Sequence, residues 1–242
     1  DEFLRKDSYK THSPLNPIRQ QAYVEVTQQA QVLDFNDRIF SISLPTGLGK
    51  TFTSVSFALK LIERLKSDIS YDYRLVYCLP FTSIIDQNHS VMENVLKEID
   101  GILPPTTKLL KHHYLSDVFY NDGNRQYEID ESQYLINTWE ASMIITTFVQ
   151  LFQTIFSNRN KALMKFCSMA NSVIILDEIQ AIPYKYWLLL NQILPFIAEK
   201  MNIYFILVTA TQPLIFRETY SEVIELVENK DYYFSLFNRT RL

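Results

Sequence analysis

The chain alternates short, continuous apolar runs with longer segments in which apolar residues recur at helical spacing. The apolar runs predict strands at 39–44, 74–79, 142–146, 173–176 and 204–208. The segments with helical spacing lie at 18–33, 51–65, 83–99, 149–155 and 186–201, the last despite Pro195. Because the strands are apolar at successive positions, both of their faces should be buried, as in a parallel sheet. This alternation predicts an α/β fold, a mostly parallel β-sheet with helices on both faces.

Three segments fall outside this alternation. Residues 1–15 are polar and predict a linker or arm, 101–133 gives no clear element, and 229–242 is expected to begin another linker. No stretch approaches the ~20 apolar residues that span a membrane, and the charged first residues argue against a secretory leader. We therefore expect a cytoplasmic protein with no membrane partner and, since no initiator Met is present, a piece of a longer protein.

Charge and cysteine content narrow the class of protein. A net charge of −4 over 242 residues argues against a protein that grips nucleic acid by charge alone, while a local basic groove stays open. The two cysteines, Cys78 and Cys167, lie in or beside apolar stretches. We expect buried thiols in a reduced compartment.

Glycine use points to one loop. The chain has four glycines, and two of them, Gly47 and Gly49, lie in the stretch Leu44-Pro45-Thr46-Gly47-Leu48-Gly49-Lys50-Thr51 between a predicted strand and a predicted helix. The stretch matches the phosphate-binding pattern G-x-x-x-x-G-K-[ST] except that Leu44 replaces the first glycine. Backbone N–H groups would surround a phosphate, Lys50 would reach the β- and γ-phosphates, and Thr51 would bind Mg²⁺. The alternative is a chance turn before a helix.

Two more strand ends carry candidate chemistry. The buried strand 173–176 runs into Asp177 and Glu178, which suits a carboxylate that holds Mg²⁺ through its water shell and a second one that orients and deprotonates a water. The strand 204–208 runs into Thr209-Ala210-Thr211. The alternative for the two acids is a pair of solvated charges, and for the threonines an ordinary exit from a strand. The functional interpretation is favoured because ligands gather at the carboxyl ends of parallel strands, where both segments should lie with the glycine loop.

The order of these motifs resembles motifs I, II and III of a superfamily-two helicase. The chain is most similar to the helicase part of the CRISPR-associated helicase–nuclease of type I systems. The supporting stretches are Asn16–Gln21, Leu79–Gln87, Asn137–Ser142 with Ile144–Phe152, and Leu176–Pro183.

The resemblance implies a RecA-like P-loop NTPase fold, namely the first of two helicase lobes, over residues 16–228. It implies that ATP binds to Pro45, Thr46, Gly47, Leu48, Gly49, Lys50, Thr51 and one of Gln20 and Gln21, of which we take Gln21. Glu178, Lys50 and Gln180 would be catalytic, and Thr51 and Asp177 would hold Mg²⁺. Gln180, Thr209, Ala210 and Thr211 would couple the nucleotide to the other lobe. Thr82, Ser83, Thr146 and Thr147 would contact DNA phosphates.

The implied function is that of an ATP-dependent single-stranded DNA helicase or translocase in CRISPR interference, an antiviral defence. Its partners would be a guide-RNA surveillance complex and, in the same protein, a second RecA-like lobe and a metal-dependent nuclease domain. The arginine motif of that second lobe and the His-Asp pair of the nuclease are absent here, so this piece alone should be nearly inactive. The adjacent His112 and His113 favour a polar loop over a metal pair.

Two alternatives to this function stay open. One is a lobe of an RNA helicase or of a restriction-type translocase. The other is a nucleotide-gated binding module without motor activity. The aromatic clusters at 71–73 and 232–234 could stack on bases, although packing in the protein is the simpler interpretation.

Overall fold

A computed structural model describes residues 14–210 and 223–237 of the chain. In this described part, seven strands form one sheet, and every pairing in it is parallel. The strands are β1 (Ile39–Ser43), β2 (Arg74–Leu79), β3 (Leu109–His112), β4 (Met143–Thr147), β5 (Ser172–Asp177), β6 (Ile203–Thr209) and β7 (Val223–Glu225). Their order across the sheet is β3-β4-β2-β5-β6-β1-β7. All carboxyl ends therefore lie at one edge, where ligands of such sheets bind.

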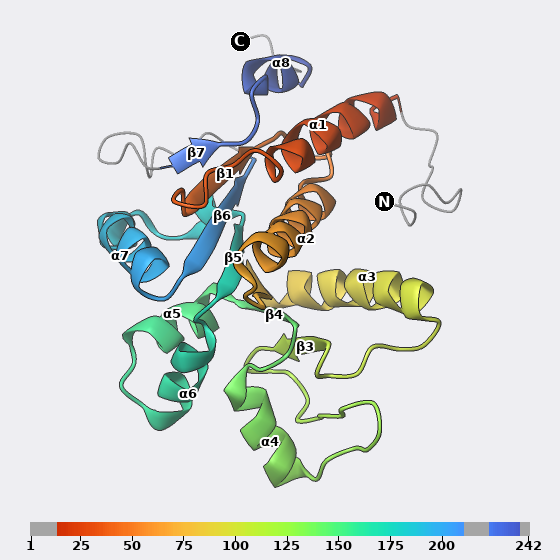
Figure 1. Cartoon of the computed structure of the whole chain (residues 1–242), viewed down its shortest axis with the longest axis vertical. Helices are drawn as coiled ribbons and strands as arrows, with labels where there is room; N and C mark the ends of the chain where they lie inside the picture. Colours follow the sequence, from red (N-terminus) through yellow and green to blue (C-terminus); the bar gives the residue numbers. More distant parts are fainter. Residues whose placement is uncertain (1–13, 211–222, 238–242) are drawn as a thin grey trace.

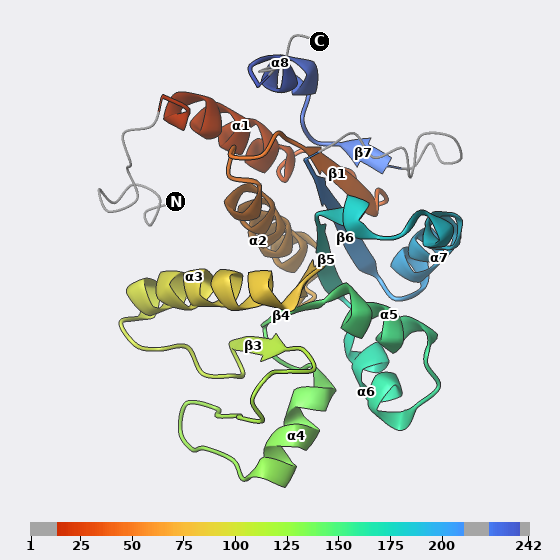
Figure 2. The same ribbon diagram turned by 180° about the vertical axis from the view of Figure 1, so that it is seen from behind.

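Helices cover both faces of the sheet (Figures 1 and 2). The helices α1 (Asn16–Gln29), α2 (Lys50–Ile69) and α3 (Thr82–Asp100) lie on one face, and α5 (Phe148–Phe156), α6 (Asn160–Ser168) and α7 (Trp187–Lys200) on the other. The helix α4 (Ile129–Thr138) lies at the β3 edge, and α8 (Lys230–Ser235) at the β7 edge. The predicted α/β class, with a parallel sheet between two helical layers, is confirmed.

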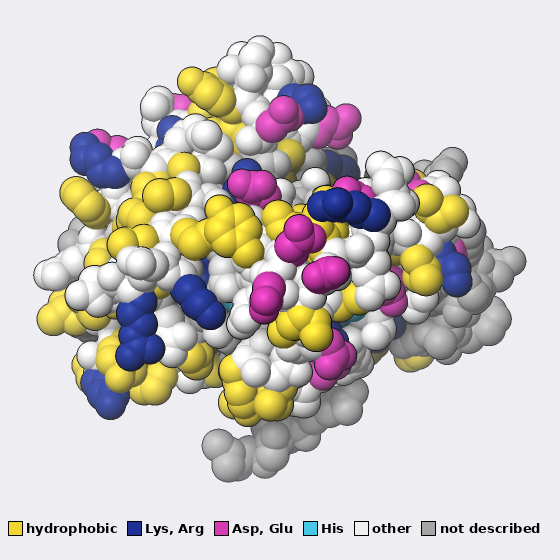
Figure 3. All heavy atoms as spheres, turned by 90° about the horizontal axis from the view of Figure 1, so that it is seen from below, with side chains coloured by type: hydrophobic (Ala, Val, Ile, Leu, Met, Phe, Trp, Pro, Cys, Tyr) yellow, Lys and Arg dark blue, Asp and Glu magenta, His cyan; other side chains and the backbone are white. Residues whose placement is uncertain are grey.

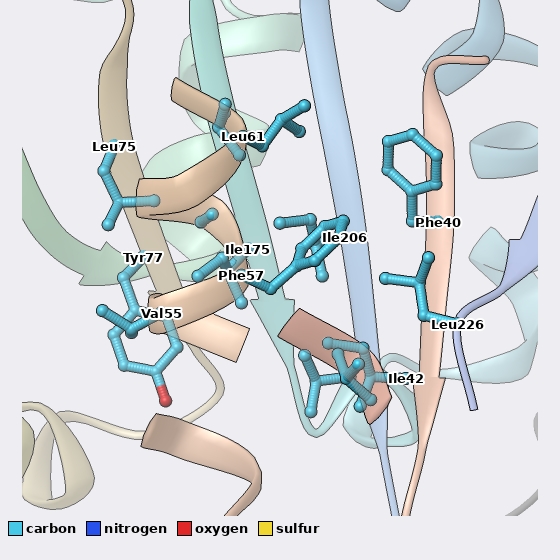
Figure 4. Packing of buried hydrophobic residues seen from close by; sticks show 14 of the residues in the cluster. Phe40, Ile42, Val55, Phe57, Leu61, Leu75, Tyr77, Ile175, Ile206 and Leu226 are labelled. Carbon is cyan, nitrogen blue, oxygen red and sulfur yellow. The ribbon is translucent and has the colours of Figure 1, made fainter. Parts of the chain in front are cut away.

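Alternate strand residues feed two apolar cores, which explains the continuous apolar runs. In β5, Val173 and Ile175 point into the core under α1–α3, whereas Ile174 and Leu176 point into the core under α5 and α7. Figure 4 shows the first core, where Phe57 and Leu61 of α2 pack over Ile175 and the neighbouring strand β6. Burial on both faces accounts for the apolar runs of the inner strands β2, β5 and β6.

The structure corrects several element predictions. The expected helix 18–33 is α1, which ends at Gln29. The segment 101–133, which gave no clear element, contains β3 and the start of α4. The helix α6 and the strand β7 were not predicted, since both are short and neither has a long apolar run. Cys78 is buried as expected, but Cys167 of α6 is exposed.

The chain stays packed beyond residue 228, where a linker was expected. Tyr233 of α8 is fully buried, and its hydroxyl donates to a carboxylate oxygen of Glu25 in α1 at 2.7 Å. Glu225 of β7 accepts hydrogen bonds from the hydroxyls of Ser41 and Ser43 in β1. These contacts hold the C-terminal elements to α1 and β1.

The aromatic clusters at 71–73 and 232–234 are divided between the core and the surface. Tyr73 and Tyr233 are buried in the core under α1–α3, while their neighbours Tyr71 and Tyr232 are exposed. None of the helices in the described part of the chain combines the length and the apolarity that crossing a bilayer requires.

Candidate nucleotide site and strand groove

The loop between β1 and α2 has the backbone that its glycines predict. Gly47 has φ +89° and Gly49, which caps α2, has φ +77°. A Cβ atom at either position would meet nothing within 4 Å, so the requirement for glycine comes from the left-handed backbone and not from crowding. The loop therefore delivers the chain directly into the N-terminus of α2, where backbone N–H groups have no partner inside the helix.

Leu44, which departs from the phosphate-binding pattern, anchors the start of this loop. Its side chain is fully buried in the core under α1–α3. Its N–H donates to the carbonyl of Thr209 at 3.2 Å, which ties the loop to the end of β6. The missing glycine therefore marks a packed strand end. The loop runs from Pro45 to Gly49, and Lys50 and Thr51 form the first turn of α2.

The two acids after β5 have different environments. Asp177 is buried, and its Oδ1 accepts from the N–H of Glu178 at 2.9 Å. Burial raises the pKa of Asp177 above its ordinary value, the hydrogen bond from Tyr77 and the charge of Lys50 act against this, and the charge of Glu178 adds to it. Glu178 has φ +55°, an uncommon backbone for a residue other than glycine, and its side chain is partly open to solvent.

A chain of polar contacts joins the loop, the acids and β6. The Nζ atom of Lys50 lies 3.6 Å from Oε1 of Glu178. Gln180 donates from Nε2 to the other Glu178 oxygen, and its own Oε1 accepts from the Thr209 hydroxyl at 2.9 Å. Lys50 and Thr209, at the two ends of this series of contacts, are both buried, so the side chains of Glu178 and Gln180 between them are fixed in position. Ala210 follows at the end of β6, and Thr211 lies outside the described residues.

Two predicted metal ligands meet at one further side chain. The Tyr77 hydroxyl donates to Oδ2 of Asp177 at 2.5 Å and lies 3.5 Å from Oγ1 of Thr51. Burial, followed by the charge of Asp177, raises the pKa of Tyr77 well above its ordinary value, so it stays a neutral donor. The Thr51 hydroxyl and the Asp177 carboxylate, which both lie within 3.5 Å of this phenol, are oxygen donors of the kind that fits Mg²⁺, with phosphate and water oxygens completing the shell. Among the described residues no group of three or more His, Cys, Asp or Glu could hold a metal without such help.

Arg19 is a residue at this site to which sequence reasoning gave no role. From α1, its Nε donates to the carbonyl of Gly47 at 2.7 Å, and its Nη1 donates to Asn16 at 3.0 Å. Gln20 and Gln21, expected to contact adenine, are both exposed on α1. The stretch Asn16–Gln21 therefore does lie beside the loop, but Arg19 is the residue that touches it.

A groove of about 580 Å³ lies at the same sheet edge, beyond β2 and β4. It is lined by Pro80, Phe81, Thr82, Ser83, Tyr114, Thr147, Val149, Gln150 and Gln153. Three of the four residues predicted to contact DNA are among them, although they come from two segments more than 60 residues apart in the chain. None of its lining residues in the described part of the chain is charged, and Phe81 and Tyr114 are 59% and 77% exposed.

The fourth predicted DNA residue, Thr146, is fully buried below the groove. Its hydroxyl donates to the carbonyl of His112 at 2.7 Å. The hydroxyl of Thr147 caps α5 by accepting from the N–H of Gln150 at 3.1 Å. In this conformation the two threonines shape the groove, whereas Thr82 and Ser83 present side chains to it.

His112, expected with His113 in a polar loop, is instead the last residue of β3. Its Nδ1 accepts from Nε1 of the buried Trp139 at 2.7 Å. Burial, with the nearby charge of Lys165, lowers the pKa of His112 to about 3. Nearby, Lys165 donates to the Oε1 atom of Gln150 at 2.9 Å, and burial lowers its pKa to about 8.

Comparisons with known proteins identify the family and the fold. Residues 16–219 match the DEAD/DEAH box helicase family. The CRISPR-associated nuclease/helicase Cas3 of Haloferax volcanii is 34% identical over an alignment of 187 residues that covers 74% of this chain and 20% of that protein. The chain thus spans a fifth of the length of this curated relative.

Solved structures share the fold. The crystal structure of T. fusca Cas3 has a TM-score of 0.58 at 18% identity, over 79% of this chain and 21% of that one. The DEAD-box helicase Mss116 bound to ssRNA and UDP-BeF has a TM-score of 0.53 at 15% identity, over 89% of this chain and 41% of that one. The chain has the RecA-like fold of these helicases and belongs to the DEAD/DEAH box helicase family.

Proposed function

We propose that the chain is the ATP-binding lobe of an ATP-dependent single-stranded DNA translocase that acts in CRISPR interference. In the full-length protein it works with a second RecA-like lobe and a nuclease domain, and a guide-RNA surveillance complex recruits it. The observation that carries the proposal is the polar chain from Lys50 through Glu178 and Gln180 to Thr209, which lies against the phosphate-binding loop. The similarity to the Haloferax protein supports the CRISPR context.

In ATP hydrolysis, the phosphate-binding loop and the first turn of α2 bind the phosphates, and the acids at the end of β5 act on the cation and the water. The phosphates lie on the N-terminus of α2, and Lys50 binds the β- and γ-phosphates. Thr51 and Asp177 hold Mg²⁺, which neutralises phosphate charge when it is bound. Glu178 orients the attacking water and accepts its proton. Because Lys50 lies 3.6 Å from Oε1 of Glu178, a γ-phosphate that attracts Lys50 would weaken this contact and leave Glu178 free to act as the base.

Coupling runs along the same contacts. A shift of Glu178 moves Gln180, because the two side chains share a hydrogen bond, and Gln180 bonds to Thr209. Hydrolysis by the lobe alone is slow, because the arginine that stabilises the transition state comes from the second lobe and is worth ~10³–10⁵ in rate.

The groove beyond β2 and β4 binds the DNA strand. The hydroxyls of Thr82 and Ser83 and the amide of Gln150 bind phosphates without reading sequence. Phe81 and Tyr114 are exposed faces on which bases stack. Because these contacts use neutral donors and aromatic rings, the groove can bind a DNA strand although the net charge of the chain is −4. The face at the β3–α4 end suits DNA less, because acidic side chains gather near its centre (Figure 3).

An RNA strand is the second candidate, because a structural relative of this fold was solved with ssRNA. Neutral phosphate contacts alone do not distinguish the two sugars, whereas a contact to the 2′-hydroxyl would.

The test uses the full-length protein and the variants Lys50→Ala and Lys66→Ala. Lys66 is the matched control, because it lies on the same helix α2 but is exposed and pairs with Asp72. We expect ATP–Mg²⁺ binding by calorimetry and DNA-stimulated hydrolysis in the wild type and in Lys66→Ala, with both lost in Lys50→Ala. Stimulation by RNA alone would favour the RNA helicase, and binding without hydrolysis on any strand would favour a nucleotide-gated module.

The groove has its own test. Ser83→Glu places a negative charge among the lining residues, and we expect it to weaken single-stranded DNA binding about tenfold, since it repels phosphates. Ser90→Glu, on an exposed position of the same helix α3 outside the groove, should leave the affinity unchanged. Equal affinities for the two variants would place the strand elsewhere.

A further inference from the structure

Tyr77 is a polar side chain in the middle of an apolar strand. It lies in β2, is fully buried, and packs in the core under α1–α3. In Figure 4 its ring lies beside Val55 of α2, and its hydroxyl oxygen points out of the labelled apolar cluster. An aliphatic residue would fill the same core without a polar atom to satisfy, so the hydroxyl calls for an explanation.

The hydroxyl is used at the nucleotide site. It donates to Oδ2 of Asp177 at 2.5 Å, and the other oxygen of this carboxylate accepts from the N–H of Glu178 at 2.9 Å. Asp177 is therefore held at both oxygens, which fixes the plane of its carboxylate. The same hydroxyl lies 3.5 Å from Oγ1 of Thr51, on the first turn of α2. One phenol thus connects both residues that are proposed to hold Mg²⁺, from a strand that carries no part of the phosphate-binding pattern.

We propose that Tyr77 is a positioning residue for the divalent cation. It orients the Asp177 carboxylate and keeps it in register with Thr51, so that the two oxygen ligands are prearranged before the cation arrives with the nucleotide. This inference rests on the proposed nucleotide site. The Tyr77 hydroxyl should therefore contribute to nucleotide affinity only when the divalent cation is present, and not when it is absent.

The test compares Tyr77→Phe with Tyr204→Phe in the full-length protein. Tyr204 is the matched control, because it is a fully buried tyrosine of β6 in the same core, and its hydroxyl donates to the carbonyl of Phe35 at 3.1 Å. ADP affinity is measured by calorimetry with Mg²⁺, with Mn²⁺ and with EDTA. ADP excludes hydrolysis, so the readout is independent of activity.

We expect Tyr77→Phe to reduce the gain in affinity that Mg²⁺ provides by about tenfold, the loss typical of one hydrogen bond to a charged group. Affinity in EDTA should stay within about twofold of the wild type, and Tyr204→Phe should keep the whole gain. An unchanged gain in Tyr77→Phe, an equal loss with and without the cation, or a variant that fails to fold would each overturn the inference and leave the nucleotide site standing. A wild type that binds no ADP would overturn the proposed function itself.

Discussion

Acid should destabilise the protein through His112, the last residue of β3, whose carbonyl accepts a hydrogen bond from Thr146 below the strand groove. Its ring accepts a hydrogen bond at Nδ1 from Trp139, meets that indole edge to face at 5.9 Å, and has a pKa of about 3 because it is buried and near Lys165. A proton on Nδ1 would point at the indole N–H, so the folded state keeps the ring neutral. The unfolded chain has an ordinary histidine, with a pKa of 6.5.

The sign and the size follow from this difference. The pKa is lower in the folded state, so the unfolded state binds the proton more readily and stability falls as pH drops below about 6.5. At pH 5 the unfolded state gains about 2 kcal/mol from this one group, and the loss continues down to about pH 3. Above pH 7 the effect vanishes.

His112→Asn isolates the effect, because an amide can still accept the hydrogen bond from Trp139 but does not titrate. Urea unfolding, followed by tryptophan fluorescence at pH 7.5 and pH 5, gives the free energy of unfolding of each protein. We expect the wild type to lose about 2 kcal/mol more than His112→Asn between these pH values. His89→Asn, in α3, is the comparison variant. Burial lowers the pKa of His89 by less than that of His112, so we expect His89→Asn to keep most of the loss in acid. Equal losses in wild type and His112→Asn would refute the reasoning.

Three further predictions concern the sites. Glu178→Gln should keep ATP binding and lower hydrolysis by about 10²–10⁴, the usual contribution of a positioned base, in a steady-state assay of the full-length protein. Thr209→Val keeps the shape of the side chain but loses its hydrogen bond to Gln180; we expect ATP binding by calorimetry to be unchanged, and stimulation of hydrolysis by DNA to fall. Lys165→Met frees Gln150 and removes a buried charge, so single-stranded DNA binding, measured by fluorescence anisotropy, should weaken a few-fold, while the free energy of unfolding at pH 7.5 should not fall.

The parts of the fold that could be predicted are those whose signal is local. A short strand rich in apolar residues, a glycine loop and a helix follow one another between Ile39 and Ile69, and each leaves its own pattern in the sequence. The strand β3 leaves almost none, because only two of its four residues are buried and polar segments surround it. It joins the sheet because β4 supplies a partner, which is a tertiary effect that no window of sequence contains.

The same distinction explains the site. The phosphate-binding loop and the acids after β5 can be found from their residue types alone. Arg19 and Tyr77 cannot, because their roles depend on contacts between distant parts of the sequence. Arg19 reaches a carbonyl 28 residues away, and Tyr77 reaches a carboxylate 100 residues away. Each looks ordinary where it stands, one in a helix and the other in an apolar strand. Thr146 shows the reverse case, a residue of the right type at a strand end whose hydroxyl the fold uses internally.

The order of the strands explains why Thr209 matters more than its residue type suggests. The strand β6 lies between β1 and β5, so its last residue is adjacent to both the phosphate-binding loop and the acidic end of β5. Thr209 uses this position twice, since its carbonyl accepts from Leu44 of the loop and its hydroxyl donates to Gln180 beside Glu178. A shift of either neighbour therefore acts on a hydrogen bond of Thr209. The strand order of the parallel sheet thus places Thr209 in contact with both the end of β1 and the side chain that bonds to Glu178. The sequence that separates these motifs forms the other strands and helices of the sheet, and so determines this order.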